Sequence, residues 1–381
     1  PEKKKNKHRN MALNVAIYTD IGHDADDVLA LMVALADHKA GRIRLLYICT
    51  VSQRNLQRGQ NVQHLCALMG VSNMPVFFSS RCEAKALDGR PLDRCVDLWR
   101  YVRHGGKYQP APGVVNVATA HPAKTKITPM VLSFGEQSVQ DQQSILRKHA
   151  SVRVLVIGPG VDPELWAPIV SHVECVVVQG GYRDDKSFNV QGDSESSDAI
   201  WNCGAAVLCV DKTIAYKTRL SRPQFKSLCE AAAVHQRDFQ LLVQLGVMEF
   251  RDAARNLFNC LNFAVSNPGS KPVMLGAVEF DPDNAAHVEL REVLTCSSFE
   301  CQWIDCLKQL PPLYDITAYL LLRDTGPVQD PQNRWYEVGQ VAKKAWQVLH
   351  VHKPETYMRE VFKELRRAVD SMAPPVSPTG S

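Results

Sequence analysis

The sequence lacks the features that mark membrane-spanning, exported and nucleic-acid-binding proteins. It has no run of about 18 apolar residues, so a membrane-spanning helix is not expected. Its first residues lack the apolar core of a signal peptide. Lysine plus arginine (44) nearly balance aspartate plus glutamate (40), which leaves a net charge of +4. This balance implies no large field for binding nucleic acid. We therefore expect neither nucleic acid nor membrane as a partner.

Paired cysteine motifs are also missing. The chain has 12 cysteines, but none form a C-x-x-C pair, and the Cys/His spacing does not resemble a zinc site. A chain of 381 residues with 45% hydrophobic residues can bury a large core without disulfides. Reduced thiols and a cytoplasmic setting are the expectation.

Short apolar runs alternate with helical stretches along much of the chain. This alternation predicts an α/β fold with a mostly parallel central sheet and helices on both faces. We expect strands over 15–19, 44–50, 74–78, 152–157, 175–178 and 205–210, and helices over 28–36, 55–69, 136–149, 222–245 and 250–263. Residues 313–322 are an apolar segment with an acidic residue near its start.

The remaining segments complete the predicted domain organisation. Residues 79–127 suggest a loop-rich insertion near the site. Residues 336–372 are interpreted as two amphipathic helical stretches. We expect disordered tails at 1–12 and 373–381, a main domain over 13–325, and a C-terminal helical extension over 326–372.

Acidic residues crowd directly after the first expected strand, in the segment TDIGHDADDVLAL. Asp20, Asp24, Asp26 and Asp27 lie within eight positions. Like charges this close are costly unless a cation neutralises them, and a hard cation with oxygen ligands does so most simply. The carboxyl ends of strands are also where open α/β sheets bind ligands. The alternative interpretation is an acidic helix start, which accounts for Asp26 and Asp27 but not for all four.

This segment resembles the N-terminal signature of the inosine-uridine nucleoside hydrolase family, D-x-D-x-G-x-D-D followed by A-L-A-L. The resemblance implies that Asp20 binds metal and acts as general base. It implies that Asp27 binds metal, and that Asp26 holds a ribose hydroxyl. One extra residue before the Asp pair makes Asp24 a competitor for either role.

Later segments resemble family motifs in the same order. The strand before Gly158 resembles the one whose end supplies a backbone carbonyl to the metal. Ser187-Phe188-Asn189 resembles E-F-N, which makes Asn189 a ribose ligand. Tyr314-Asp315 resembles the H-D segment, which makes Asp315 the last metal ligand. The resemblance implies a Ca²⁺ site of Asp20, Asp27, Asp315 and the Gly158 carbonyl.

Several positions depart from the family pattern. Tyr18 stands where the family has its first Asp, Ser52 where it has an Asn, Ser187 where it has a Glu, and Tyr314 where it has a His. Loss of charged hydrogen bonds, each worth about 1.5–3 kcal/mol, weakens or reshapes the grip on ribose.

The remaining candidates concern the leaving base. Tyr314 has an ordinary pKa of about 10 and can donate a hydrogen bond. Tyr182 can stack on a base, and His104 is a candidate acid, although a histidine in a Gly-rich loop is more often simply exposed.

These observations lead to two hypotheses about function, and a third is disfavoured. The first is a metal-dependent hydrolase of the N-glycosidic bond of a ribonucleoside or related nucleotide, with Asp20 as base. The second is a homologue that binds a nucleotide or ADP-ribose-like ligand with little turnover, as in type III effectors that plant-pathogenic bacteria inject into host cells. The third, an acidic-loop phosphatase, lacks the matching lysine. A homo-oligomer is compatible with either of the first two.

Overall fold

The computed structural model describes residues 12–21, 26–52, 55–71, 73–81, 132–133, 135–183, 187–215, 217–221, 223–224, 227–228, 231, 274–275, 278–279, 313–324 and 335–372. The predicted insertion at 79–127 and the predicted helices at 222–245 and 250–263 lie largely outside these residues. The predicted tails lie outside them too, apart from residue 12.

A nine-stranded sheet forms the centre of the molecule, in the order β10-β11-β7-β6-β5-β1-β2-β3-β4. All neighbours pair in parallel except β10 and β11, which are antiparallel. The strands are β1 Leu13–Thr19, β2 Ile43–Thr50, β3 Val76–Phe78, β4 Leu132–Ser133, β5 Val152–Ile157, β6 Val173–Gln179, β7 Ala206–Val210, β10 Tyr336–Ala342 and β11 Ala345–Val351. The predicted parallel α/β sheet is confirmed.

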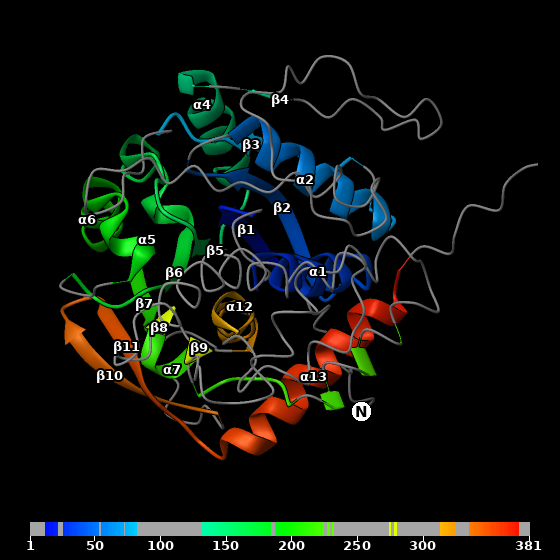
Figure 1. Cartoon of the computed structure of the whole chain (residues 1–381). Helices are drawn as coiled ribbons and strands as arrows, with labels where there is room; N and C mark the ends of the chain where they lie inside the picture. The colour runs from blue at the N-terminus through cyan, green and yellow to red at the C-terminus, as the bar shows by residue number, and fades with distance from the viewer. Residues whose placement is uncertain are drawn as a thin grey trace, which may run out of the picture.

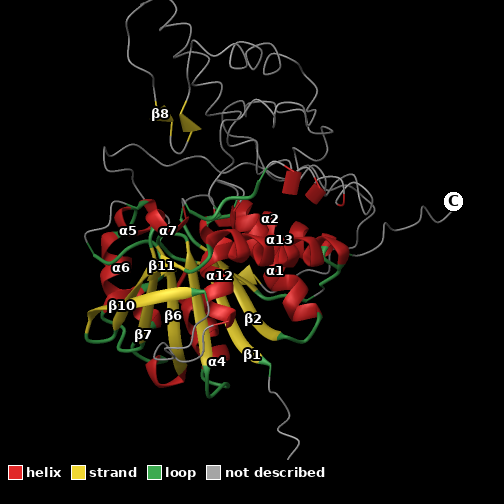
Figure 2. Ribbon diagram, turned by 90° about the horizontal axis from the view of Figure 1, so that it is seen from below, coloured by secondary structure: helices red, strands yellow, loops and turns green. Residues whose placement is uncertain are grey.

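Helices cover both faces of this sheet (Figures 1 and 2). They are α1 Asp26–Lys39, α2 Asn55–Leu68, α4 Gly135–Leu146, α5 Phe188–Gln191, α6 Ser194–Trp201, α7 Lys212–Ala215, α12 Tyr314–Asp324 and α13 Pro354–Asp370. A separate hairpin joins β8 Met274–Leu275 to β9 Val278–Glu279.

The core has two layers because successive residues of a strand face opposite sides of the sheet. In β1, Val15 and Ile17 pack with α1, α2, α12 and α13, whereas Ala16 and Tyr18 pack with α4 and α6. All four side chains are fully buried. This two-sided burial explains why the strand is a continuous apolar run in the sequence.

The C-terminal segment corrects one prediction. Residues 336–351 were expected to be helical, but they form the β10–β11 hairpin, and only α13 is a helix. The hairpin forms in place of a helix because β11 pairs with the edge of β7, from Ala345 with Val207 to Gln347 with Cys209. An isolated segment cannot display this long-range pairing.

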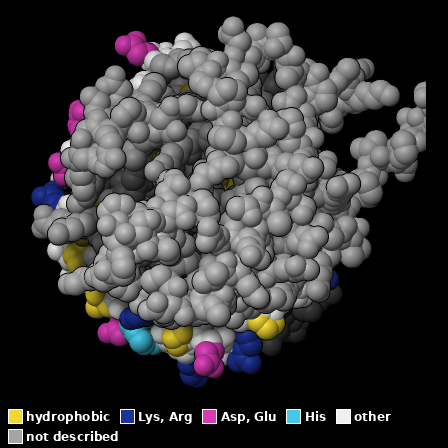
Figure 3. Space-filling view, viewed as in Figure 1, with side chains coloured by type: hydrophobic (Ala, Val, Ile, Leu, Met, Phe, Trp, Pro, Cys, Tyr) yellow, Lys and Arg dark blue, Asp and Glu magenta, His cyan; other side chains and the backbone are white. Residues whose placement is uncertain are grey.

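None of the helices among the described residues is both long and apolar enough to cross a membrane. Along the rim seen in Figure 3, acidic and basic side chains are interspersed.

Candidate metal and ligand site

The order of the strands changes direction at β1. From β1 the chain proceeds through β2, β3 and β4 on one side, and then returns to place β5 on the other side. Thr19, the last residue of β1, pairs with Thr50 of β2 and with Ile157 of β5. A ligand site in an open α/β sheet lies at such a switch point, outside the carboxyl ends of the strands.

Asp20 and Gly158 are the residues that follow β1 and β5, and they lie against each other. A Cβ placed on Gly158 would come within 2.7 Å of both the backbone nitrogen and Oδ1 of Asp20, and within 2.8 Å of Val51. Asp20 is 5% exposed. The absence of a side chain at Gly158 therefore allows the Asp20 carboxylate to lie at the switch point.

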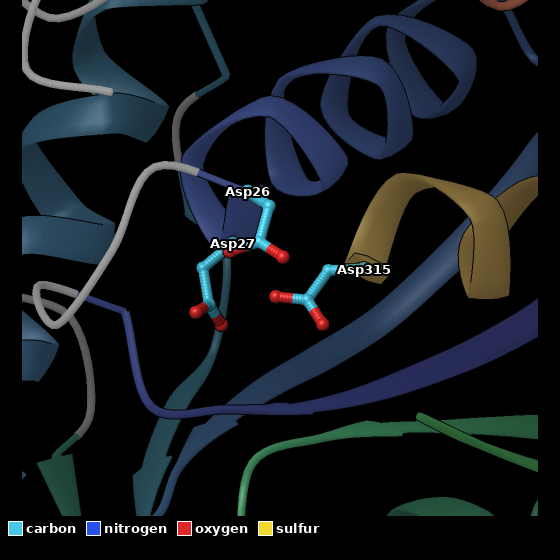
Figure 4. A group of neighbouring side chains, drawn as sticks. All are labelled: Asp26, Asp27 and Asp315. Carbon is cyan, nitrogen blue, oxygen red and sulfur yellow. The ribbon is translucent and has the colours of Figure 1, made fainter. Parts of the chain in front are cut away.

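Three further carboxylates meet at the starts of two helices, as Figure 4 shows. Asp26 and Asp27 are in the first turn of α1, and Asp315 is in the first turn of α12. One oxygen from each lies within 4.8 Å of the others, and all three residues are buried. The structure thus brings Asp315 of α12 beside Asp26 and Asp27 of α1.

Local bonds explain why the acidic segment adopts this shape. The Thr19 hydroxyl donates to Asp27 Oδ1 and accepts from the backbone N–H of Ile21 at 3.2 Å. The Ile21 carbonyl accepts from Arg58 of α2 at 2.9 Å. The carboxylates also face the positive ends of their own helix dipoles, which partly offsets their repulsion.

The donor set fits a hard divalent cation. Three buried carboxylates at this separation repel one another strongly, and helix dipoles of about half a charge each do not neutralise them. Oxygen is the ligand atom that Ca²⁺ and Mg²⁺ prefer, and the three side chains that converge here are all carboxylates. Asp26, to which the resemblance assigns a ribose hydroxyl, also has an oxygen within 4.8 Å of the other two carboxylates.

Two serines at this edge have hydroxyls without a protein partner among the described residues. They are Ser52, after β2, and Ser187, before α5. Ser52 is 1% exposed and has a positive φ of 70°, and Ser187 is 7% exposed beside Gly180. Leaving a buried hydroxyl unbonded is costly, and strained backbone clusters at binding sites, so both features favour a ligand with its own polar groups.

Asn189 and Tyr182 lie on the β6 side of the edge and are engaged with protein groups. Asn189 Nδ2 donates to Gln179 Oε1 at 2.5 Å. The Tyr182 ring packs edge-on against Trp201 at 5.2 Å between ring centroids, and the Arg183 guanidinium lies 5.5 Å from its centre. Tyr182 is thus held in place by Trp201 and Arg183.

The other candidates are placed as follows. Tyr314 is half-buried and immediately precedes Asp315 at the start of α12. Asp24 and His104 lie outside the described residues.

Arg58 is a residue that motif analysis missed. It is 1% exposed and supports the acidic segment through Ile21. A signal was present, because Arg58 shares the spacing of the buried Val62 and Leu65 on one face of α2. A buried arginine on an apolar face indicates a specific partner.

Solved structures provide the comparison with known proteins. The crystal structure of the effector protein XOO4466 aligns over 96% of this chain and 95% of that chain, with a TM-score of 0.64 and 14% identity. Type III effector protein XopQ, in complex with adenosine diphosphate ribose, aligns over 96% and 95% with a TM-score of 0.62 and 16% identity. An inosine-uridine preferring nucleoside hydrolase from Bacillus anthracis aligns over 94% and 99% with a TM-score of 0.55 and 12% identity.

The chain therefore has the nucleoside-hydrolase fold. Three carboxylates that could hold a metal ion lie at the switch point of its sheet. Its structural neighbours include both nucleoside hydrolases and type III effectors, the two groups that the motifs resemble. At these identities the likeness concerns the fold. No protein-family model matches the sequence itself, and neither does any curated protein.

Proposed function

We propose that this chain binds a divalent cation, and with it the ribose of a nucleoside or nucleotide, and that it hydrolyses the N-glycosidic bond. The observation that carries this proposal is the convergence of Asp26, Asp27 and Asp315 from two helices distant in sequence. The nucleoside-hydrolase fold, shared over nearly the whole chain, supports the same conclusion.

Asp27 and Asp315 would hold the cation together with Asp20 and the Gly158 carbonyl. Ca²⁺ takes 6–8 oxygen ligands in a flexible arrangement, which suits carboxylates from separate elements better than the stricter octahedron of Mg²⁺. When bound, the cation lowers the pKa of a water molecule and orients it.

Ribose recognition falls to the residues around this centre. Asp26 accepts a hydrogen bond from a sugar hydroxyl. The hydroxyls of Ser52 and Ser187, which have no partner among the described residues, provide two more hydrogen-bonding groups. Asn189 donates a further hydrogen bond to the sugar once its bond to Gln179 is broken. Serines are shorter than the Asn and Glu of the resembled motifs, so the sugar lies deeper or is held through water.

Cleavage then requires a base and help for the leaving group. Asp20 takes a proton from the attacking water. The sugar passes through an oxocarbenium-like state, as in other glycosidic cleavages. Tyr314 donates a hydrogen bond to the departing base, and Tyr182 stacks on that base.

A second candidate function is binding of an ADP-ribose-like ligand without efficient turnover. The observation that favours it is the pair of serines, because weaker contacts to ribose reduce transition-state stabilisation more than they reduce binding. The effector XopQ, solved with adenosine diphosphate ribose, has the same fold.

One experiment tests both candidates. The protein is incubated with Ca²⁺ and inosine, uridine or adenosine, and free ribose is measured. Binding of ADP-ribose is measured by calorimetry in parallel. Ribose release that EDTA and Asp315→Asn both abolish supports hydrolysis. Saturable ADP-ribose binding without ribose release supports the second candidate. Absence of both, with no Ca²⁺-dependent rise in melting temperature, contradicts the proposal.

A further inference from the structure

A buried carboxylate lies at the far end of α1 from the candidate cation site. Asp37 is completely buried, although it is ionisable. It is ten residues after Asp27, which corresponds to about 15 Å along the helix. A charge in such a position needs partners in fixed geometry, because burying it alone is prohibitively costly.

The partners of Asp37 come from separate elements. Its Oδ2 accepts from the Tyr319 hydroxyl at 2.6 Å and from Arg323 Nη1 at 3.2 Å, both on α12. Its Oδ1 accepts from Arg42 Nε at 2.6 Å, in the turn after α1, and from Arg367 Nη2 at 2.5 Å, on α13. One carboxylate thus joins α1, α12 and α13.

These bonds bear on the cation site because of what else α1 and α12 carry. Both helices begin at that site, α1 with Asp26 and Asp27 and α12 with Asp315. The helices pack against each other through apolar side chains, and such contacts are not directional. A shift of α12 by one turn, about 5.4 Å, would keep apolar contact but separate the carboxylates.

The hydroxyl of Tyr319 is suited to hold α12 at one position along α1. Burial, followed by the charge of Asp37, raises the pKa of Tyr319 well above its ordinary value, so the group stays a donor. Without a cation, repulsion among the three carboxylates would act to separate the starts of α1 and α12. A directional bond between the same two helices opposes that displacement.

We infer that Asp37 is a positioning residue for the cation site, and that its bond with Tyr319 fixes the register of α12 on α1. It thereby sets the separation of Asp315 from Asp26 and Asp27. This inference rests on the proposed function, since it concerns the same cation.

The test uses Eu³⁺ as a spectroscopic substitute for Ca²⁺ in the full chain. Luminescence lifetimes in H₂O and D₂O count the water molecules on the bound ion, and Ca²⁺ competition gives the affinity. The variants are Tyr319→Phe and Asp37→Asn, with Arg42→Gln as matched control. Arg42 also bonds Asp37, but its side chain is 42% exposed and it lies on neither α12 nor α13. Melting temperatures of the cation-free proteins report stability separately.

We expect Tyr319→Phe to weaken Ca²⁺ binding about tenfold, as loss of a group that orients ligands does. One carboxylate oxygen should be replaced by about one additional water on Eu³⁺. Arg42→Gln should lower the melting temperature and leave both cation readouts unchanged. If Asp37→Asn does not fold, Tyr319→Phe decides.

Two outcomes contradict the inference in distinguishable ways. Wild-type binding that Asp315→Asn abolishes, with Tyr319→Phe equal to wild type in affinity and water count, overturns this inference and leaves the proposed function standing. Failure of the wild type to bind either ion, or equal binding by Asp315→Asn, overturns the proposed function and this inference with it.

Discussion

The hydroxyl of Thr19, the last residue of β1, donates to the carboxylate of Asp27 in the first turn of α1. This bond spans the acidic segment and connects the central strand to the helix that carries two of the three converging carboxylates. It makes Thr19 a direct support of the candidate site.

Replacing Thr19 tests that support. Thr19→Val keeps the shape of the side chain but removes the hydroxyl, so we expect a loss of about 2 kcal/mol in the free energy of unfolding, typical of a bond to a charged group. The stabilisation by Ca²⁺ should also shrink. Chemical denaturation with and without Ca²⁺ measures both. Thr19→Ser, which retains the hydroxyl, should keep most of the free energy of unfolding and most of the stabilisation by Ca²⁺. Equal effects of the two variants would contradict the role of the bond.

Gly158 is predicted to tolerate no side chain. The Cβ of Gly158→Ala would meet backbone and carboxylate atoms of Asp20 at 2.7 Å, so we expect a loss of about 1–3 kcal/mol, as for other overpacked sites, and weaker Ca²⁺ binding. Thermal unfolding and calorimetry check these. Gly41→Ala is the control, since nothing lies within 4 Å of its Cβ. Its left-handed backbone costs about 1–2 kcal/mol, and its Ca²⁺ affinity should equal that of wild type.

Asp162, which follows Val161 after β5, should make stability depend on pH. Burial raises the pKa of its carboxyl above the ordinary 3.8, despite hydrogen bonds from Ser80 and Ser79 that lower it. A raised folded pKa gives a contribution that is fully present below pH 3.8 and is lost as the pH rises through the folded pKa.

The variant Asp162→Asn isolates this contribution, because the amide oxygen still accepts from Ser80 but does not ionise. We expect the stability of wild type relative to Asp162→Asn to decrease as the pH rises from about 3 to about 7. Urea unfolding across that range measures it. A difference that is constant, or that grows with pH, would show that the carboxyl has no raised pKa in the folded protein.

Cysteine reactivity tests the burial of the sheet and of α2. Burial raises the pKa of Cys66 and of Cys175 to about 12, so neither thiol ionises appreciably at neutral pH. Because the thiolate is the reactive form, both should resist iodoacetamide in the native protein. Mass spectrometry should find both labelled after denaturation. Rapid native labelling of either residue would contradict its placement.

The parts of the fold that are local in sequence could be predicted. Six of the strands, β1, β2, β3, β5, β6 and β7, are apolar runs bounded by polar turns, and their burial leaves little ambiguity, whereas the two-residue β4 has no such signal. The convergence of Asp20 with Gly158 was also predictable, because parallel neighbours end at the same edge of the sheet. The meeting of Asp315 with Asp27 followed from the order of the motifs.

Other features depend on contacts that no local pattern contains. Residues 336–351 have apolar side chains at positions that fit a helical period and a strand period equally, and the Lys343-Lys344 turn carries no glycine or asparagine to indicate a hairpin. Only pairing with β7 decides between them. The role of Asp37 was likewise hidden, since its partner Arg367 is 330 positions away.

The packing of α1 against α13 has a consequence for synthesis. Lys39, at the end of α1, donates to the Ser371 carbonyl at 2.7 Å, although the two residues are 332 positions apart. During translation, the apolar surface of α1 that α13 covers would stay exposed until residues 354–370 have left the ribosome. Contacts between such distant residues form late, so a chain that stops before residue 354 is expected to aggregate rather than to fold into a smaller protein.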